Sequence, residues 1–97
     1  MEVKATGASE VTITGNIQSI EDYQNIKDVV RSIIDKGANS ITIRIPDSVS
    51  MPSSVIGFLL KLVHVDKIVM SILVRDDRLY NLMEILNLIT ILNVKKM

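Results

Sequence analysis

The sequence contains no cysteine and no tryptophan, a single histidine, and few aromatic residues, which make up 3% of the chain. Without cysteine the chain can form neither disulfides nor thiolate-ligated metal sites, and it has no thiol nucleophile. One histidine, His64, supplies too few nitrogen ligands for most other metal sites. We therefore expect no metal and no cofactor, and we expect His64 to be a solvated helix residue.

Net charge is also absent, because eleven Lys and Arg balance eleven Asp and Glu. No basic excess is present to neutralise phosphates, so we expect no nucleic-acid partner. Residues 1–9 lack the basic stretch and apolar run of a secretory signal. The most apolar segment, residues 55–65, contains Lys61 and His64 and is shorter than the roughly 20 residues that span a bilayer. These features predict a cytoplasmic protein that does not insert into a membrane.

The hydrophobic residues are mostly aliphatic. They make up 47% of the chain, and aromatic residues are rare among them. A chain of 97 residues is the size of one domain. It contains no linker, low-complexity tract or long-period repeat. We predict a single domain over residues 1–97 that folds around an aliphatic core.

Alternating apolar residues indicate strands, and apolar residues at helical spacing indicate helices. Strand patterns occur at residues 1–6, 11–17, 41–45, 67–75 and 89–94, and helical patterns at residues 19–37, 53–66 and 76–87. Ser19 and Asp76 suit helix N-caps, while Gly37 and Asn87 suit the left-handed residue that ends a helix. The order β-β-α-β-α-β-α-β predicts an α/β fold with a mixed sheet and helices packed on it. A rival ferredoxin-type fold, β-α-β-β-α-β, would need one helix fewer.

The second helix has an unusual surface. Positions spaced three, four and three residues apart line one narrow stripe of it, namely Ser54, Gly57, Lys61 and His64. Apolar side chains flank this stripe at Ile56, Leu60 and Val63, while the set expected to face the sheet is Val55, Phe58, Leu59, Leu62 and Val65. Gly57 costs about 1 kcal/mol relative to alanine in a helix interior. Its presence indicates a surface that another molecule approaches closely, although simple burial of the apolar flank is an alternative.

The run from Ser50 to Leu60, S-M-P-S-S-V-I-G-F-L-L, resembles the switch region of the STAS domain family, named for sulphate transporters and anti-sigma factor antagonists. In that family a strand leads through a loop to a serine pair and an apolar helix. Gly15 and Gly37 also stand where the family ends its second strand and its first helix. The resemblance covers nearly the whole chain and implies a STAS-like mixed sheet with helices packed on it.

The resemblance implies a non-enzymatic anti-sigma factor antagonist whose partner is both an anti-sigma factor and a serine kinase. In regulatory members the first serine of the pair is phosphorylated, and this role falls on Ser53. A phosphate at a helix N-terminus meets free amides and a favourable dipole, while its charge can release a bound partner. The partner-binding face implied by the resemblance spans residues 50–61 and consists of Ser50, Met51, Pro52, Ser53, Ser54, Ile56, Gly57, Leu60 and Lys61.

Other interpretations stay open at this point. Pro52 and Arg44 stand where the family has acids, which favours a constitutive, unphosphorylated accessory subunit of a membrane transport or chemosensory assembly. Ser53 also has a purely structural alternative as a helix N-cap. No set of residues indicates an enzyme. The one candidate carboxylate pair, Asp76 and Asp77, is adjacent at a helix start, so the two side chains point in different directions. The sequence indicates no oligomeric state.

Overall fold

The alternating pattern of the central strands buries one set of side chains and leaves the other partly exposed. The computed structural model describes all 97 residues. In the central strand, Ile41, Ile43 and Ile45 are buried, while Thr42 and Arg44 are partly exposed. The elements in chain order are β1 (Glu2–Gly7), β2 (Glu10–Thr14), α1 (Ile20–Asp35), β3 (Ser40–Ile45), α2 (Ser53–His64), β4 (Val69–Val74), α3 (Asp77–Ile85) and β5 (Val94–Lys96). This order confirms the predicted α/β fold, and its three helices exclude the ferredoxin-type alternative.

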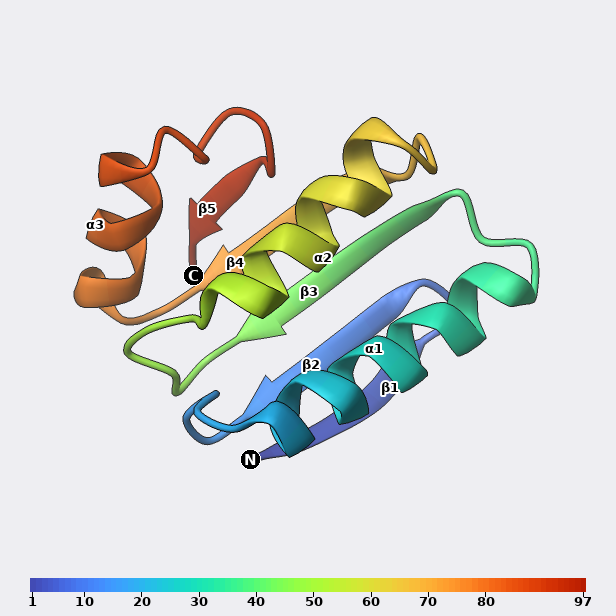
Figure 1. Cartoon of the computed structure of the whole chain (residues 1–97), viewed down its shortest axis with the longest axis horizontal. Helices are drawn as coiled ribbons and strands as arrows, with labels where there is room; N and C mark the ends of the chain where they lie inside the picture. The colour runs from blue at the N-terminus through green and yellow to red at the C-terminus, as the bar shows by residue number, and fades with distance from the viewer.

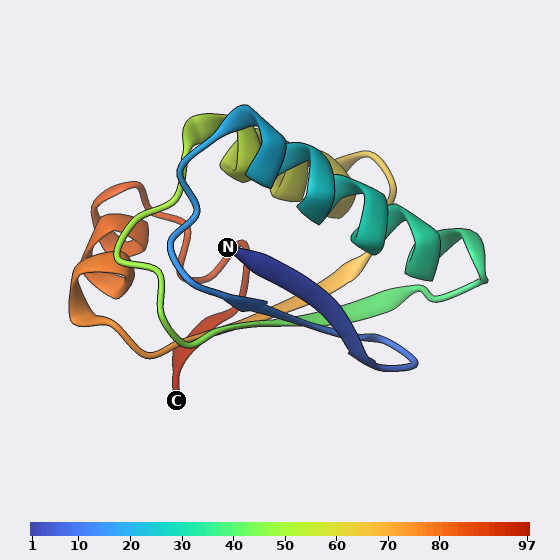
Figure 2. The same ribbon diagram turned by 90° about the horizontal axis from the view of Figure 1, so that it is seen from below.

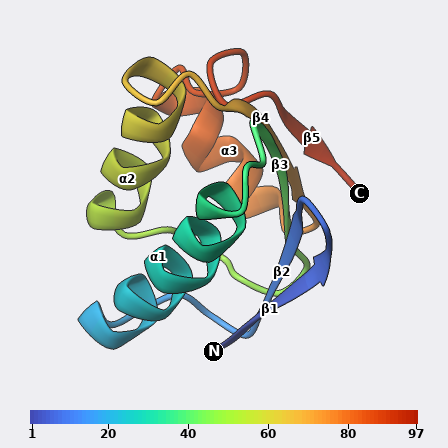
Figure 3. The same cartoon turned by 90° about the vertical axis from the view of Figure 1, so that its right-hand side faces the viewer.

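The five strands form one mixed sheet in the spatial order β1-β2-β3-β4-β5. The β1–β2 hairpin is antiparallel, whereas β2, β3, β4 and β5 run parallel to one another. Parallel neighbours need crossover connections, and right-handed crossovers that all advance in one direction place their helices on the same side of a sheet. Figures 2 and 3 show α1 and α2 together on one face and the opposite face of the sheet uncovered. The smaller α3 lies beside the ends of β4 and β5 (Figure 1).

A single apolar cluster of 23 buried residues fills the space between the sheet and the helices. Ile43 lies at its centre, because its strand pairs with Val11 of β2 on one side and with Ile72 of β4 on the other. All three side chains are almost fully buried. None of the three helices combines the length and the hydrophobicity needed to span a lipid bilayer.

The start of α1 is fixed by a reciprocal cap. The Ser19 hydroxyl accepts a hydrogen bond from the Asp22 N–H at 3.1 Å, and the Asp22 carboxylate accepts one from the Ser19 N–H at 3.2 Å. The Gln18 N–H also donates to Asp22, and these backbone bonds hold the pKa of the Asp22 carboxyl below its usual value. This pair satisfies amides that would otherwise lack a partner in the helix. The predicted Ser19 cap is confirmed.

Asp76 caps α3 and is held by Arg78. Its carboxylate accepts from the Arg78 backbone N–H at 2.8 Å and pairs with the guanidinium at 2.8 Å. The Arg78 side chain is the main reason that the pKa of Asp76 falls from 3.8 to about 2. An ion pair between Lys96 and Asp77 ties the last strand to the same helix. Both aspartates therefore have structural roles here.

The lowered pKa of Asp76 predicts an acid-dependent loss of stability. A carboxyl whose folded-state pKa is below its unfolded-state pKa stabilises the fold fully above the unfolded value, and this contribution is lost as pH falls through the folded value. We expect the melting temperature of the wild type to approach that of Asp76→Asn between pH 4 and pH 2, since asparagine can cap but cannot ionise. Thermal melts of both proteins at pH 5, 4, 3 and 2 measure this difference. A difference that stays constant over this range would contradict the assigned pairing with Arg78.

Helix ends and turns use residues in the left-handed region. Gly37 has φ 102° after α1 and Asn87 has φ 58° after α3, as the sequence predicts. Lys67 and Asn93 are also left-handed, with φ values of 58° and 50°. Because a strand cannot continue through such a residue, β4 begins only at Val69 and β5 only at Val94.

Two predictions about the elements are wrong. The last strand was expected at residues 89–94, but residues 89–93 form turns, and the Leu92 N–H donates to the carbonyl of Leu88 at 2.9 Å. Leu92 enters the core through a helix-like turn instead of a ladder, whereas Ile91 is 43% exposed. Val65 was expected to face the sheet, but it is 65% exposed because α2 ends at His64.

Candidate functional site

The loop that leads from β3 to α2 is held by a buried serine. Ser48 has no exposed surface and is the only polar residue among the buried set. Its hydroxyl accepts from the backbone N–H of Ile17 at 3.1 Å and donates to the carbonyl of Ser50 at 2.7 Å. One side chain thus joins this loop to the segment between β2 and α1.

Two further side chains extend this connection. The Asn16 side-chain oxygen accepts from the Val49 N–H at 3.1 Å, and the Asp47 carboxylate accepts from the Gly15 N–H at 2.9 Å. Gly15 has φ 79°, and a Cβ added to it would lie 3.2 Å from the Cα of Met1, so the chain turns there in a conformation that suits glycine. These bonds hold the loop after β3 against residues 15–17.

Sequence patterns did not indicate Asn16, Asp47 or Ser48, because polar residues next to glycine or between prolines are typical of solvated loops. They become structural only when two segments that are about 30 positions apart meet at the same end of the sheet. The one available signal is Ile17, an apolar residue just beyond a Gly-Asn turn, which indicates that this turn approaches the core.

Side chains of α1 contact the aromatic ring of Phe58 in α2. Phe58 of α2 is buried, and the Tyr23 ring packs edge-on against it with ring centres 6.2 Å apart. The Arg31 guanidinium lies 5.8 Å from the centre of the Phe58 ring and also pairs with Asp66 at 3.2 Å. These contacts on the α1 side leave the opposite surface of α2 directed away from its neighbour.

The N-terminus of α2 differs from those of α1 and α3. Its N-cap is Pro52, which makes no side-chain capping bond, and its first turn contains no acid. Ser53 and Ser54 are the first two helical residues and both are exposed. The helix therefore starts at Ser53, as predicted, but the alternative role of Ser53 as an N-cap is wrong. Its hydroxyl is available for another use.

The polar stripe of α2 is exposed as the spacing predicts, and His64 is a solvated helix residue. The exposed set is Ser54, Gly57, Lys61 and His64, and the flanking set of Ile56, Leu60 and Val63 is only partly buried. The residues expected to face the sheet are buried except for Val65, namely Val55, Phe58, Leu59 and Leu62. An apolar margin thus lies directly beside an exposed glycine.

Gly57 is not required by the fold. No atom lies within 4 Å of a Cβ built at this position, and the backbone has an ordinary helical conformation. Most residues other than proline could therefore occupy it, and good helix formers would stabilise α2 by up to about 1 kcal/mol relative to glycine. The other helix-associated glycine, Gly37, has a conformational reason in its positive φ.

Most of the predicted partner-binding residues are exposed or partly exposed along the loop and α2. Met51 is the exception, because it is 5% exposed and packs in the core beneath the loop. It therefore supports this surface from below and does not offer a contact. We call the remaining set the loop–helix face: Ser50, Pro52, Ser53, Ser54, Ile56, Gly57, Leu60 and Lys61.

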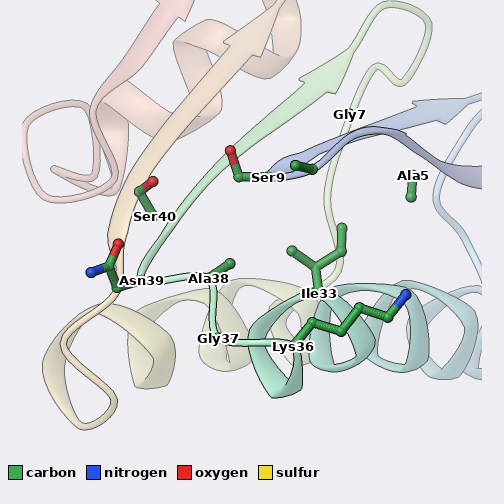
Figure 4. A pocket seen from close by; sticks show the side chains of 10 residues that line it. Ala5, Gly7, Ser9, Ile33, Lys36, Gly37, Ala38, Asn39 and Ser40 are labelled. Atoms are coloured by element: carbon green, nitrogen blue, oxygen red, sulfur yellow. The ribbon is translucent and has the colours of Figure 1, made fainter.

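Outside the loop–helix face, chemistry could be located at metal clusters, unpaired buried polar groups or hollows. No group of three or more His, Cys, Asp or Glu side chains is arranged to hold a metal ion. Every buried side-chain nitrogen or oxygen has a hydrogen-bond partner. The largest hollows lie between β1 and the C-terminal half of α1, and Figure 4 shows one of them beside the β1–β2 turn. They do not include any residue of the loop–helix face.

No family model, curated protein or solved structure matches this chain. What the structure establishes is a small α/β domain with a five-stranded mixed sheet and helices packed on one face.

Proposed function

We propose that this domain is a non-enzymatic, STAS-like protein-interaction module that binds a protein partner through the loop–helix face. The single observation that carries this proposal is Gly57, a helix-interior glycine that the fold does not need. A residue that lowers helix stability without a structural reason is best explained by an external requirement, here the close approach of another polypeptide.

The surroundings of Gly57 suit a protein partner. Ile56 and Leu60 are partly exposed beside it and offer apolar contact area, while Ser53 and Lys61 supply polar groups at the margin. Protein interfaces combine an apolar centre with a polar rim in this way. The fixed loop lowers the entropic cost of binding, because the surface need not become ordered on contact.

The proposed partner is an anti-sigma factor of the serine-kinase type, and Ser53 is the proposed site of phosphorylation. Ser53 is exposed at the first helical position, where a phosphate would meet backbone amides that no side chain caps. No carboxylate lies in the first turn to repel it. The added charge of about −1.5 to −2 would disfavour an acidic or apolar partner surface without unfolding the helix.

Phosphorylation of Ser53 is tested by mass spectrometry of the chain after incubation with the partner kinase and ATP. We expect one phosphate on the wild type and on Ser54→Ala, and none on Ser53→Ala. We also expect Ser53→Asp to bind the partner at least about tenfold more weakly than the unphosphorylated wild type does, since an added charge must be desolvated in the interface.

Asn81→Asp is the matched control, because it adds the same charge at an exposed position of α3. It should leave the affinity unchanged. Unmodified wild-type chain together with full binding by Ser53→Asp would reject the switch.

A second candidate function keeps the same surface without the switch. Pro52, and not an acid, precedes Ser53, and the Arg44 side chain pairs with Glu10 at 3.9 Å. The site thus lacks the carboxylates that accompany the phosphorylated serine in the family it resembles. This favours a constitutive accessory subunit of a membrane transport or chemosensory assembly, and binding that persists in Ser53→Asp but fails in Gly57→Arg would support it.

A further inference from the structure

The outer edge of β1 is open. This strand pairs with β2 on one side only and stands at the end of the sheet. Its side chains are almost all exposed, and it contains no proline. The backbone N–H and C=O groups that point away from β2 are therefore free to pair with another strand.

An additional strand at this edge would also find a place to bury side chains. Two hollows of about 490 and 520 Å³ lie between β1 and α1, and their apolar lining includes Val3, Ala5, Val29 and Ile33. Figure 4 shows Ile33 of α1 pointing toward the β1–β2 hairpin across the first hollow, with Lys36 extended along its margin. Every second side chain of an added strand would point toward these hollows.

Lysine on an edge strand normally opposes pairing with a second chain. Here Lys4 is accompanied by Glu2 on the same side of β1, and the two side chains form an exposed ion pair at 3.5 Å. The edge therefore carries one charge of each sign, two residues apart. A strand with this pattern is complementary to a reversed copy of itself.

Symmetry limits the registers in which two such strands can pair. Side chains of directly opposed residues in an antiparallel pair point to the same face of the sheet. When the two strands are copies related by a two-fold axis, this condition holds only if the axis lies midway between one residue and the same residue of the second copy. The regular part of β1 runs from Glu2 to Ala5, because the register with β2 shifts between Ala5 and Gly7. The axis can then lie at Glu2, Val3, Lys4 or Ala5.

Only one of these registers pairs opposite charges. An axis at Val3 places Glu2 of each copy opposite Lys4 of the other, which gives two opposite-charge pairs. An axis at Glu2 places the two glutamates opposite each other, and an axis at Lys4 does the same with the two lysines. An axis at Ala5 leaves Glu2 without a charged partner and continues into the irregular part of the strand. Opposite charges across a strand pair stabilise it and like charges destabilise it, so the charges select the Val3 register.

We propose that β1 is a dimerisation strand, which pairs antiparallel with β1 of a second copy of this chain about an axis at Val3. The two five-stranded sheets then form one continuous sheet, with the helices of both copies on the same face. The pairing closes the open edge and covers part of the hollows. No residue that lines the two hollows beside β1 belongs to the loop–helix face, so each copy of the proposed dimer keeps that face free.

Charge exchange at Glu2 and Lys4 tests this dimer by sedimentation equilibrium over 10 μM to 1 mM. We expect the wild type to move from the 10.8 kDa monomer toward twice this mass as concentration rises. Lys4→Glu and Glu2→Lys should each raise the dissociation constant about tenfold or more. The double variant, with both charges exchanged, should restore dimerisation, because it re-creates the opposite-charge pairs. Lys95→Glu, on the exposed part of β5, is the control and should dimerise like the wild type.

The three substituted positions are exposed, and circular dichroism is used to check that all four variants fold. A wild-type chain that stays monomeric to 1 mM would overturn the proposal, and so would a dimer that resists both single substitutions. Failure of the double variant to recover would also reject the Val3 register. Closure of β1 by an extended segment of a different protein, with no self-association, is a further contradicting outcome.

Discussion

Gly57→Arg should weaken partner binding about 100-fold or more while leaving the domain folded and slightly more stable. No atom lies within 4 Å of a Cβ built at Gly57, so the arginine side chain extends into solvent without disturbing the core. Arginine is a better helix former than glycine, and we expect the free energy of unfolding to rise by roughly 1 kcal/mol. A partner that packs closely against the bare helix would meet a long charged side chain instead. Isothermal titration calorimetry and urea denaturation measure the two effects on the same samples.

Two control variants separate close approach from general surface damage. Gly57→Ala should be stabilised to a similar extent but should lose much less affinity than Gly57→Arg, because it adds one methyl group. Asn81→Arg adds arginine to an exposed position of α3 and should bind as the wild type does. Equal binding by Gly57→Arg and the wild type would show that α2 does not contact the partner through this position.

Ser48→Ala should lower the free energy of unfolding by about 2 kcal/mol. The substitution removes the acceptor for the Ile17 N–H and the donor to the Ser50 carbonyl in a place with no exposed surface. A buried backbone group that loses its only partner costs about 1–3 kcal/mol. Ser50→Ala is the matched control, because the Ser50 side chain is exposed and should contribute almost nothing.

The same substitution should loosen the loop–helix face. Hydrogen exchange of the Ile17 amide should become faster than in the wild type, and partner affinity should fall because the loop must become ordered on binding. A loss of stability below about 0.5 kcal/mol, with unchanged exchange at Ile17, would contradict the role of Ser48 as the anchor of this loop.

Local signals in the sequence were sufficient for the order and type of the elements. Ser19 and Asp76 begin helices through their own side chains, and Gly37 and Asn87 end them by their tolerance of positive φ. Each of these features depends on residues within one turn of chain. The polar stripe on α2 was predictable for the same reason.

Features that depend on distant segments were not predictable in this way. Ser48 is buried only because residues 15–17 meet the loop after β3. Met51, predicted as a surface contact, is in the core because the same bonds hold the loop against the sheet. Residues 89–93 form turns where the sequence predicts a strand, because short apolar runs fit both patterns. Tertiary packing decided each of these positions.

Site-specific photo-cross-linking tests the central claim most directly. A photoreactive residue at Lys61, on the exposed stripe one turn from Gly57, is compared with the same residue at Asn81 of α3. We predict that one protein is cross-linked from position 61 and not from position 81, and that Gly57→Arg abolishes this product. The same products from both positions, or a product from position 61 that survives Gly57→Arg, would contradict binding through the loop–helix face.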